Sequence, residues 1–248
     1  MTSISTSDQE NLIAALRTKT WFGFDLDDTL HEFRRASRAA TTHCLNRIAS
    51  KNPHVKLEDL QEQYQSILRQ GTAGAFTDGE SSHDYRRERF TATLRHFELS
   101  HDLIEDLLKD YERVLVDNLS LKAGALSLLK AIKSSGRKIA VITEGPQDAQ
   151  ERAVRDLGIA SYIDFLATTN HFGVAKTSGL FGKVLGHLGI QPHKITYVGD
   201  SKERDIEPAT QEGIYAIHLQ DAQEDPLVMD PPSVNSLEVL AQLIPLLS

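Results

Sequence analysis

The chain has 248 residues, of which 40% are hydrophobic and 25% are charged, a composition typical of a globular protein with a buried core. Its formal net charge of −8 argues against a nucleic acid polymer or an anionic membrane as the main partner, because both are polyanions. A single cysteine, Cys44, excludes an intrachain disulfide framework, and no apolar run reaches transmembrane length. We therefore expect a cytoplasmic enzyme, monomeric or homodimeric, that binds neither nucleic acid nor membrane.

Short apolar segments alternate with helical patterns along most of the chain. After an N-terminal arm, residues 1–18, that we expect to be helical or disordered, strands are predicted at 21–24, 138–143, 162–167, 194–199 and 214–218. Helices are predicted at 125–134, 147–157, 178–188 and 205–212. Near-continuous apolar strands between helices indicate a parallel sheet covered on both faces. The predicted fold class is α/β, with a Rossmann-like sheet.

One long interruption separates the first two predicted strands. It has no strand pattern, and its apolar residues recur at helical spacing near 57–68 and 103–115, on either side of a predicted loop at 71–84. We therefore predict a small all-α cap domain formed by residues 33–118. The Rossmann-like catalytic core would comprise residues 1–32 and 119–248, with the cap as a lid over the first strand end.

An acidic stretch, Asp25-Leu26-Asp27-Asp28-Thr29, follows the apolar run at 21–24. If extended geometry continues past this strand, residues two apart project to the same side, which brings the carboxylates of Asp25 and Asp27 together. Two close carboxylates repel each other unless a cation lies between them or one is protonated. Either arrangement is useful in catalysis: a metal-held nucleophile, or a proton donor beside an ionised partner.

Further polar residues fall at the ends of other predicted strands. Thr143 ends the second strand, and Asp200 follows the fourth. In open α/β sheets, ligands bind outside the carboxyl ends of the strands. We therefore expect Asp25, Thr143 and Asp200 to face one site.

Four motifs in chain order resemble those of the haloacid dehalogenase superfamily. They are Asp-x-Asp-x-Thr at 25–29, Thr143, Lys176 in a loop before a helix, and Gly-Asp-x-x-x-x-Asp with Asp200 and Asp205. The segment Phe172-Gly173-Val174-Ala175-Lys176 is most similar to the branch that includes pyrimidine and other nucleotide 5′-nucleotidases. The resemblance covers about residues 18–220 and is weak between 33 and 119.

The resemblance implies a phosphatase that cleaves a small phosphomonoester, with a nucleoside monophosphate or a sugar phosphate favoured. Asp25 would attack phosphorus and form an aspartyl-phosphate, and Asp27 would act as general acid and then general base. Lys176 would neutralise the phosphate and restrain Asp25. Thr143, with the backbone N–H of Glu144, would bind a phosphoryl oxygen.

The resemblance also implies a Mg²⁺ cofactor. Mg²⁺ prefers hard oxygen ligands in octahedral geometry. Asp25, the backbone carbonyl of Asp27 and Asp200 would hold it, with Asp205 in support. Asp205 could also serve as the N-cap of the helix that follows it.

Other activities remain open at this point. A phosphomutase would use the same groups, whereas a haloacid dehalogenase needs no proton donor at Asp27. The stretch at 25–28 also matches the Asp-x-Asp-Asp motif of terpene cyclases, although the strand before it does not suit a cyclase, and a prenyl phosphate would suit an apolar lid. A non-enzymatic sensor would not need the complete set of acids and Lys176.

Residues that depart from the family pattern, and residues of the predicted cap, are harder to assign to a role than the four motifs. Glu144 stands where relatives often carry Asn or Ser, so we expect its carboxylate to point away from the phosphate or to contact the leaving group. The run Arg86-Arg87-Glu88-Arg89 is typical of a solvated helix face, with recognition of a substrate anion as the alternative. His31 is interpreted as an ordinary surface or core residue. The candidates for substrate selection are Phe76, His83 and Tyr85.

Overall fold

A single mixed sheet forms the centre of the core. The structure, a computed structural model, describes residues 5–71 and 74–247, and within these ranges seven strands form one sheet in the order β3-β2-β1-β4-β5-β7-β6. The strands are β1 (Trp21–Phe24), β2 (Lys138–Thr143), β3 (Phe165–Thr168), β4 (Ile195–Gly199), β5 (Tyr215–Leu219), β6 (Leu227–Met229) and β7 (Pro232–Val234). All neighbours pair in parallel except β6 and β7. This sheet confirms the predicted α/β class.

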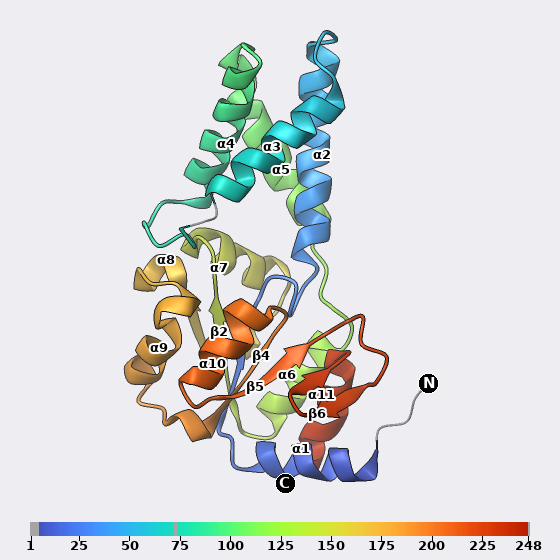
Figure 1. Cartoon of the computed structure of the whole chain (residues 1–248), viewed down its shortest axis with the longest axis vertical. Coiled ribbons are helices and arrows are strands. Elements are labelled where there is room, and N and C mark those ends of the chain that lie inside the picture. The colour runs from blue at the N-terminus through green and yellow to red at the C-terminus, as the bar shows by residue number, and fades with distance from the viewer. Residues whose placement is uncertain (1–4, 72–73, 248) are drawn as a thin grey trace.

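Helices cover both faces of the sheet, as Figure 1 shows. One face packs against α1 (Thr6–Arg17), α6 (Ala125–Ser134) and α11 (Leu237–Leu243), and the other against α9 (Leu180–Leu188) and α10 (Glu207–Gln211). Within β2, Ile139 and Val141 join the first apolar cluster, whereas Ala140 and Ile142 join the second. This alternation is the two-residue periodicity of a strand that is buried on both faces.

Several predicted boundaries differ from those observed. The third strand was predicted at 162–167 but begins at Phe165, because residues 160–162 form a 3₁₀ turn. The arm at 1–18 contains α1, whose Leu12 and Leu16 are fully buried against the core. The sequence patterns did not predict β6, β7 or α11. These elements are short, and β6 and β7 have three residues each, too few to show a periodicity.

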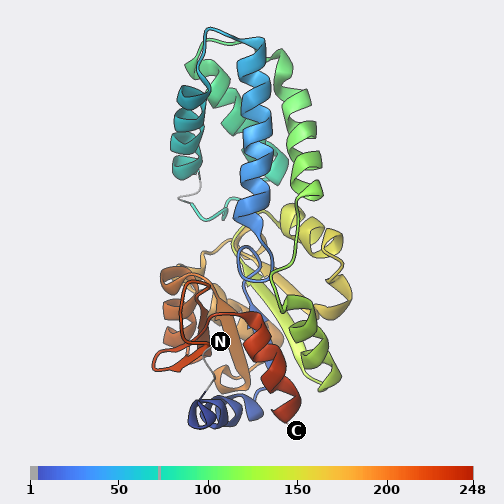
Figure 2. The same cartoon turned by 90° about the vertical axis from the view of Figure 1, so that its right-hand side faces the viewer.

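Four helices stand as a bundle above the sheet (Figure 2). They are α2 (Phe33–Lys51), α3 (Leu57–Gly71), α4 (Ser82–His96) and α5 (Ile104–Asp117). They share their own apolar cluster, in which the rings of Tyr64, Phe90 and Tyr111 pack at centroid distances of 5.4 and 6.2 Å. Among the described residues, none of the helices is both long and apolar enough to cross a bilayer.

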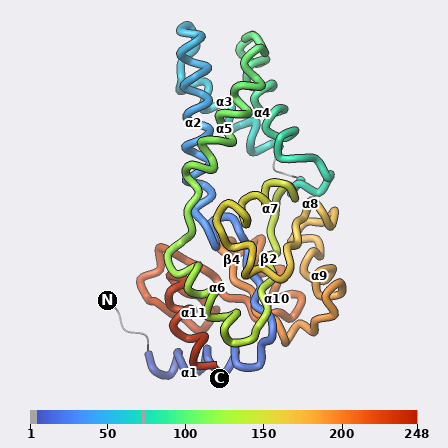
Figure 3. The backbone as a smooth tube through the Cα atoms, turned by 180° about the vertical axis from the view of Figure 1, so that it is seen from behind, coloured from blue at the N-terminus to red at the C-terminus, as the bar shows by residue number. Residues whose placement is uncertain are grey.

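The chain passes between the sheet and the bundle twice, at adjacent points. The backbone N–H of Glu32 donates to the carbonyl of Ser120 at 2.9 Å, and that of Lys122 donates to Leu30 at 3.0 Å. On the far side of the bundle, α4 faces α7 (Gln147–Asp156) and α8 (Thr169–Phe172), as Figure 3 shows. There the backbone and side chain of Ser82 donate to Asp148 at 2.9 and 2.7 Å.

The predicted loop at 71–84 is shorter in the structure. Gly71 ends α3 and Ser82 begins α4, and Thr72 and Ala73 lie outside the described residues. Ser81 caps α4 by accepting the N–H of Asp84 at 3.2 Å, and Asp84 in turn accepts the hydroxyl proton of Ser81 at 2.5 Å. These two hydrogen bonds fix where α4 begins.

Candidate active site

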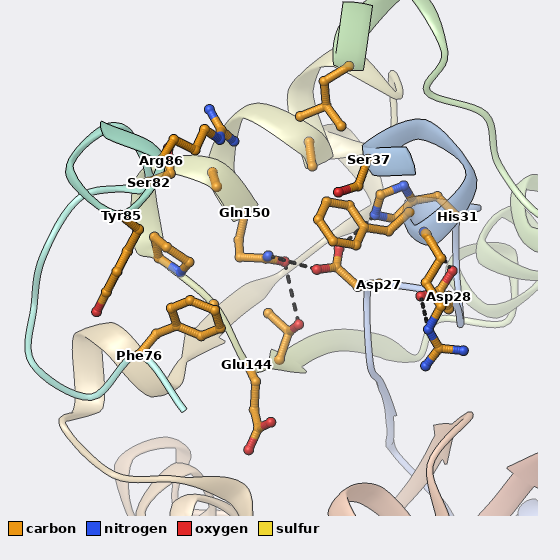
Figure 4. Close-up of a pocket in the computed structure, with 18 of the residues that line it drawn as sticks. Asp27, Asp28, His31, Ser37, Phe76, Ser82, Tyr85, Arg86, Glu144 and Gln150 are labelled. Carbon is orange, nitrogen blue, oxygen red and sulfur yellow. Dashed lines mark hydrogen bonds and ion pairs between the residues drawn. The ribbon is translucent and has the colours of Figure 1, made fainter. Parts of the chain in front are cut away.

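A cavity of about 550 Å³ lies between the carboxyl edge of the sheet and the helical bundle. Its walls include the loop after β1, the start of α7 and the inner sides of α2, α4 and α5. Figure 4 shows Asp27 and Gln150 facing each other, with Phe76 and Tyr85 at the side formed by the bundle. The cavity therefore joins groups from the sheet edge and from the bundle in one space.

Lys176 lies at the centre of the charges at the sheet edge. Its Nζ is 2.6 Å from Oδ1 of Asp25 and 2.6 Å from Oδ1 of Asp205, and all three residues are buried. Burial lowers the pKa of the Lys176 ammonium group, but Asp205 and Asp25 outweigh that effect and the net shift is upward. Lys176 is therefore a permanent cation that restrains Asp25, as the resemblance implies.

The loop after β4 places Asp205 beside Lys176. A Cβ atom at Gly199 would lie 2.4 Å from Cβ and Cγ of Asp205, so only glycine leaves room for this carboxyl group. The backbone N–H of Ser201 donates to Oδ2 of Asp205 at 3.0 Å, and the hydroxyl of Tyr197 lies 3.0 Å from Oδ1. The helix that follows, α10, has Ile206 as its N-cap, and the turn before it is capped by Ser201, which accepts the N–H of Arg204. The interpretation of Asp205 as an N-cap is therefore wrong.

Three carboxyl groups converge next to Lys176. One oxygen each of Asp25, Asp200 and Asp205 lies within 4.8 Å of the other two. Burial raises the pKa of Asp25 to about 8, an effect that Lys176 opposes, and burial and Asp205 raise the pKa of Asp200. The surplus negative charge and the hard oxygen donors suit Mg²⁺, so these residues fit the cofactor. The Asp27 carboxylate, predicted to adjoin that of Asp25, lies outside this group.

Asp27 is instead held between two side chains. His31 Nε2 lies 2.8 Å from Oδ1 of Asp27, and the amide of Gln150 donates to Oδ2 at 3.3 Å. His31 is fully buried and Gln150 nearly so. The interpretation of His31 as an ordinary residue therefore missed its contact with Asp27. The signal was local, since the spacing of four residues returns the chain to Asp27 through the tight turn that begins at Asp28, which has a φ of 62°.

Thr143 ends β2 and Glu144 follows it, and both residues line the cavity. The hydroxyl of Thr143 donates to Oε1 of Gln150 at 3.4 Å, so Gln150 connects Thr143 to Asp27. The carboxylate of Glu144 forms an ion pair with Arg204 at 3.5 Å. Sequence reasoning had assigned no role to Gln150, which lies outside the four motifs, or to Arg204, which occupies a variable position of the fourth.

Arg34, at the start of α2, links two acids at the mouth of the site. Its guanidinium group lies 3.1 Å from Asp28 and 3.1 Å from Asp200, and its side chain is 64% exposed. The Asp28 carboxylate also accepts the backbone N–H of Arg34 at 3.0 Å, which satisfies one free N–H group in the first turn of α2. An exposed guanidinium group can move away from Asp200 at little cost.

The bundle contributes cationic and aromatic side chains to the cavity. Arg86 and Arg89 line it, so the prediction of a fully solvated helix face for this run is wrong at these two positions. Arg86 forms an ion pair with Glu112 and lies 4.7 Å from the centroid of Tyr111. Of the candidates for substrate selection, Phe76 and Tyr85 line the cavity, whereas His83 is exposed and does not.

A family model described as "Haloacid dehalogenase-like hydrolase" matches residues 23–219. The chain belongs to this family. The match includes both the sheet edge and the four-helix bundle. The resemblance that the four motifs indicated is therefore confirmed.

Relatives and solved structures agree with this membership. A glyceraldehyde 3-phosphate phosphatase of Methanocaldococcus jannaschii is 24% identical over 225 residues, which cover 89% of this chain and 95% of that protein. The pyrimidine 5′-nucleotidase YjjG of Escherichia coli is 33% identical over 125 residues, 49% of this chain and 55% of that protein. The structure of the HAD-hydrolase YfnB of Bacillus subtilis, solved with magnesium, superposes with a TM-score of 0.67 at 20% sequence identity. The superposition includes 92% of this chain and 99% of that one.

These comparisons confirm the prediction of an enzyme, a phosphatase of the haloacid dehalogenase-like family. The predicted similarity to nucleotide phosphatases is matched over about half of the chain.

Proposed function

We propose that the chain is a Mg²⁺-dependent phosphatase that hydrolyses a small phosphomonoester through a phosphorylated Asp25. The observation that carries this proposal is the arrangement of Asp25 and Lys176 beside a cluster of three carboxyl groups, at one edge of the sheet and open to the cavity. A phosphate ester resists nucleophiles because its oxygens are already negative, so the site must supply positive charge and position the attacking group.

Each side chain then has a defined task. Lys176 holds one oxygen of Asp25 at 2.6 Å, which leaves the other oxygen to attack phosphorus as the ester bond to the alcohol breaks. Asp27, oriented by His31 and Gln150, donates its proton to the leaving alcohol. Asp27 then takes a proton from the water that releases phosphate from Asp25. Thr143 and the backbone N–H of Glu144 bind a phosphoryl oxygen.

Asp25, Asp200 and the backbone carbonyl of Asp27 would hold Mg²⁺, with Asp205 in support. Bound there, the ion would neutralise part of the negative charge of the phosphoryl oxygens. Lys176, which contacts one oxygen each of Asp25 and Asp205, would fix the orientation of these two carboxylates for this role.

We infer that the substrate is a small phosphorylated metabolite, with a sugar phosphate favoured over a nucleotide. Relatives that match over most of their length are named for glyceraldehyde 3-phosphate or ribulose 1,5-bisphosphate, whereas the nucleotidase matches over about half of this chain. A phosphomutase would use the same groups and is separated only by its product. A dehalogenase would leave the proton donor at Asp27 without a task, and the strand context of residues 25–28 leaves the cyclase alternative without a helical scaffold.

Phosphate release from a panel of sugar phosphates, nucleotides and prenyl phosphates tests this proposal. With Mg²⁺, the wild type should release phosphate, and Asp25→Asn should lose activity by at least about 10³-fold while it still folds and unfolds cooperatively. EDTA should stop the reaction and added Mg²⁺ should restore it. Chloride release from a 2-haloacid without metal, in the absence of phosphatase activity, would contradict the proposal.

A further inference from the structure

Arg89, on the cavity side of α4, carries a charge that no acid compensates. Its Nη2 atom is buried and, among the described residues, has no hydrogen-bond acceptor and no carboxylate within ion-pair distance. Its Cζ lies 6.0 Å from the ring centroid of Phe76 and 5.9 Å from that of Tyr85, at the outer limit for a cation–π interaction. The side chain as a whole is half-buried, and these rings compensate the charge at its buried end only weakly.

Other cations around the cavity differ from Arg89 in this respect. Five of them have a carboxylate partner: Lys176 with Asp25 and Asp205, Arg34 with Asp28 and Asp200, Arg86 with Glu112, Arg152 with Asp148 and Glu112, and Arg204 with Glu144. A buried donor nitrogen without an acceptor is costly, because it has lost its water without gaining a hydrogen bond. An anion from a ligand would remove this cost.

We propose that Arg89 binds a second anionic group of the substrate, a carboxylate or a second phosphate, at the end of the molecule away from the phosphate that is hydrolysed. This inference rests on the proposed function and deepens it. The phosphate-binding groups lie at the sheet edge and Arg89 lies on the bundle, and all of them line one cavity. A substrate that spans the cavity would place one anion at each wall. A guanidinium group donates in a planar fork, which suits a carboxylate or a phosphate.

Paired substrates that differ mainly in the second anion test the proposal. One pair is 3-phosphoglycerate and glyceraldehyde 3-phosphate, and the other is fructose 1,6-bisphosphate and fructose 6-phosphate. In at least one pair, the wild type should prefer the member with the second anion in kcat/KM. Arg89→Met should reduce that preference by about 10- to 100-fold, the value of a charge-assisted hydrogen bond, mainly through KM. Activity on the singly anionic member should change little.

Two further variants separate charge from structure. Arg89→Lys keeps the charge without the planar fork and should retain part of the preference. Arg87→Met is the matched control on the same helix, because Arg87 pairs with Glu105 outside the cavity, and it should leave the preference unchanged. Equal losses for both members of each pair in Arg89→Met, or full preference retained in that variant, would overturn the inference.

The generic substrate p-nitrophenyl phosphate distinguishes the two levels of failure. If the wild type hydrolyses it and shows no preference within either pair, the proposal for Arg89 is wrong and the phosphatase assignment stands. If the wild type with Mg²⁺ hydrolyses neither it nor any member of the pairs, the proposed function itself fails, and the role of Arg89 fails with it.

Discussion

The sheet edge and the helical bundle line the same cavity, but their charges are arranged differently. At the sheet edge, Lys176 contacts both Asp25 and Asp205, and burial holds this set of ion pairs in place without a ligand. In the bundle, Arg86 is paired with Glu112, whereas Arg89 has no ion pair with any acid in the part of the chain that the structure describes. Because the charges of Lys176, Asp25 and Asp205 balance one another, these groups can hold their positions for the reaction with any substrate. An uncompensated cation favours one kind of ligand, so we assign the reaction to the edge and the selection of substrate to the bundle.

The largest effect on stability and activity should follow from removing Lys176, the cation that balances Asp25 and Asp205. Lys176→Met would leave Asp25 and Asp205 buried together without a counter-charge. We expect a loss of about 3 kcal/mol in the free energy of unfolding in metal-free buffer, together with loss of activity. Urea denaturation measures the first effect. The exposed Lys183→Met is a matched control and should lose less than about 0.5 kcal/mol. A stable, active Lys176→Met enzyme would contradict the central place of this ion pair.

A smaller effect should follow from loosening the proton donor. His31→Ala removes one of the two contacts that orient Asp27, and we expect kcat to fall by about 10-fold, below the full contribution of general acid catalysis. The loss should be larger for an alkyl phosphate than for p-nitrophenyl phosphate, because nitrophenolate leaves without protonation. Comparison of the two substrates measures this. An equal loss for both would show that His31 acts on something other than proton donation.

The smallest effect concerns the contact between the bundle and the core. Burial raises the pKa of Asp148, but hydrogen bonds from Ser82 and an ion pair with Arg152 outweigh it, and the pKa lies below its ordinary value. A lowered pKa means that the stabilisation is present above the unfolded pKa of about 4 and is lost as the pH falls through the folded value. Asp148→Asn should therefore cost about 1 kcal/mol at neutral pH and less near pH 3. Thermal unfolding across this range tests it, and a cost independent of pH would contradict the account.

More of the functional residues could be predicted from the sequence at the sheet edge than in the bundle, and the reason is physical. The chemistry at the sheet edge requires particular residue types at fixed spacing, so Asp25, Thr143, Lys176 and Asp200 could be found from motifs and strand ends alone. Arg89 and Gln150 reach the cavity through the packing of one helix against another element, and a run such as residues 86–89 has the same composition on a solvated face. Helical periodicity predicted α3 and α5, but the orientation of α4 depends on the contact of Ser82 with Asp148.

The central claim, that Asp25 becomes phosphorylated, is tested most directly by trapping the intermediate. In Asp27→Asn, attack by Asp25 can still occur on a substrate with a good leaving group, whereas the following hydrolysis lacks its base. The enzyme should be mixed with p-nitrophenyl phosphate and Mg²⁺, quenched in acid, and mapped by peptide mass spectrometry. We predict an added phosphoryl group on the peptide that contains Asp25, and none in Asp25→Asn. Rapid phosphate release with no label on this peptide, or a label on another residue, would contradict the account.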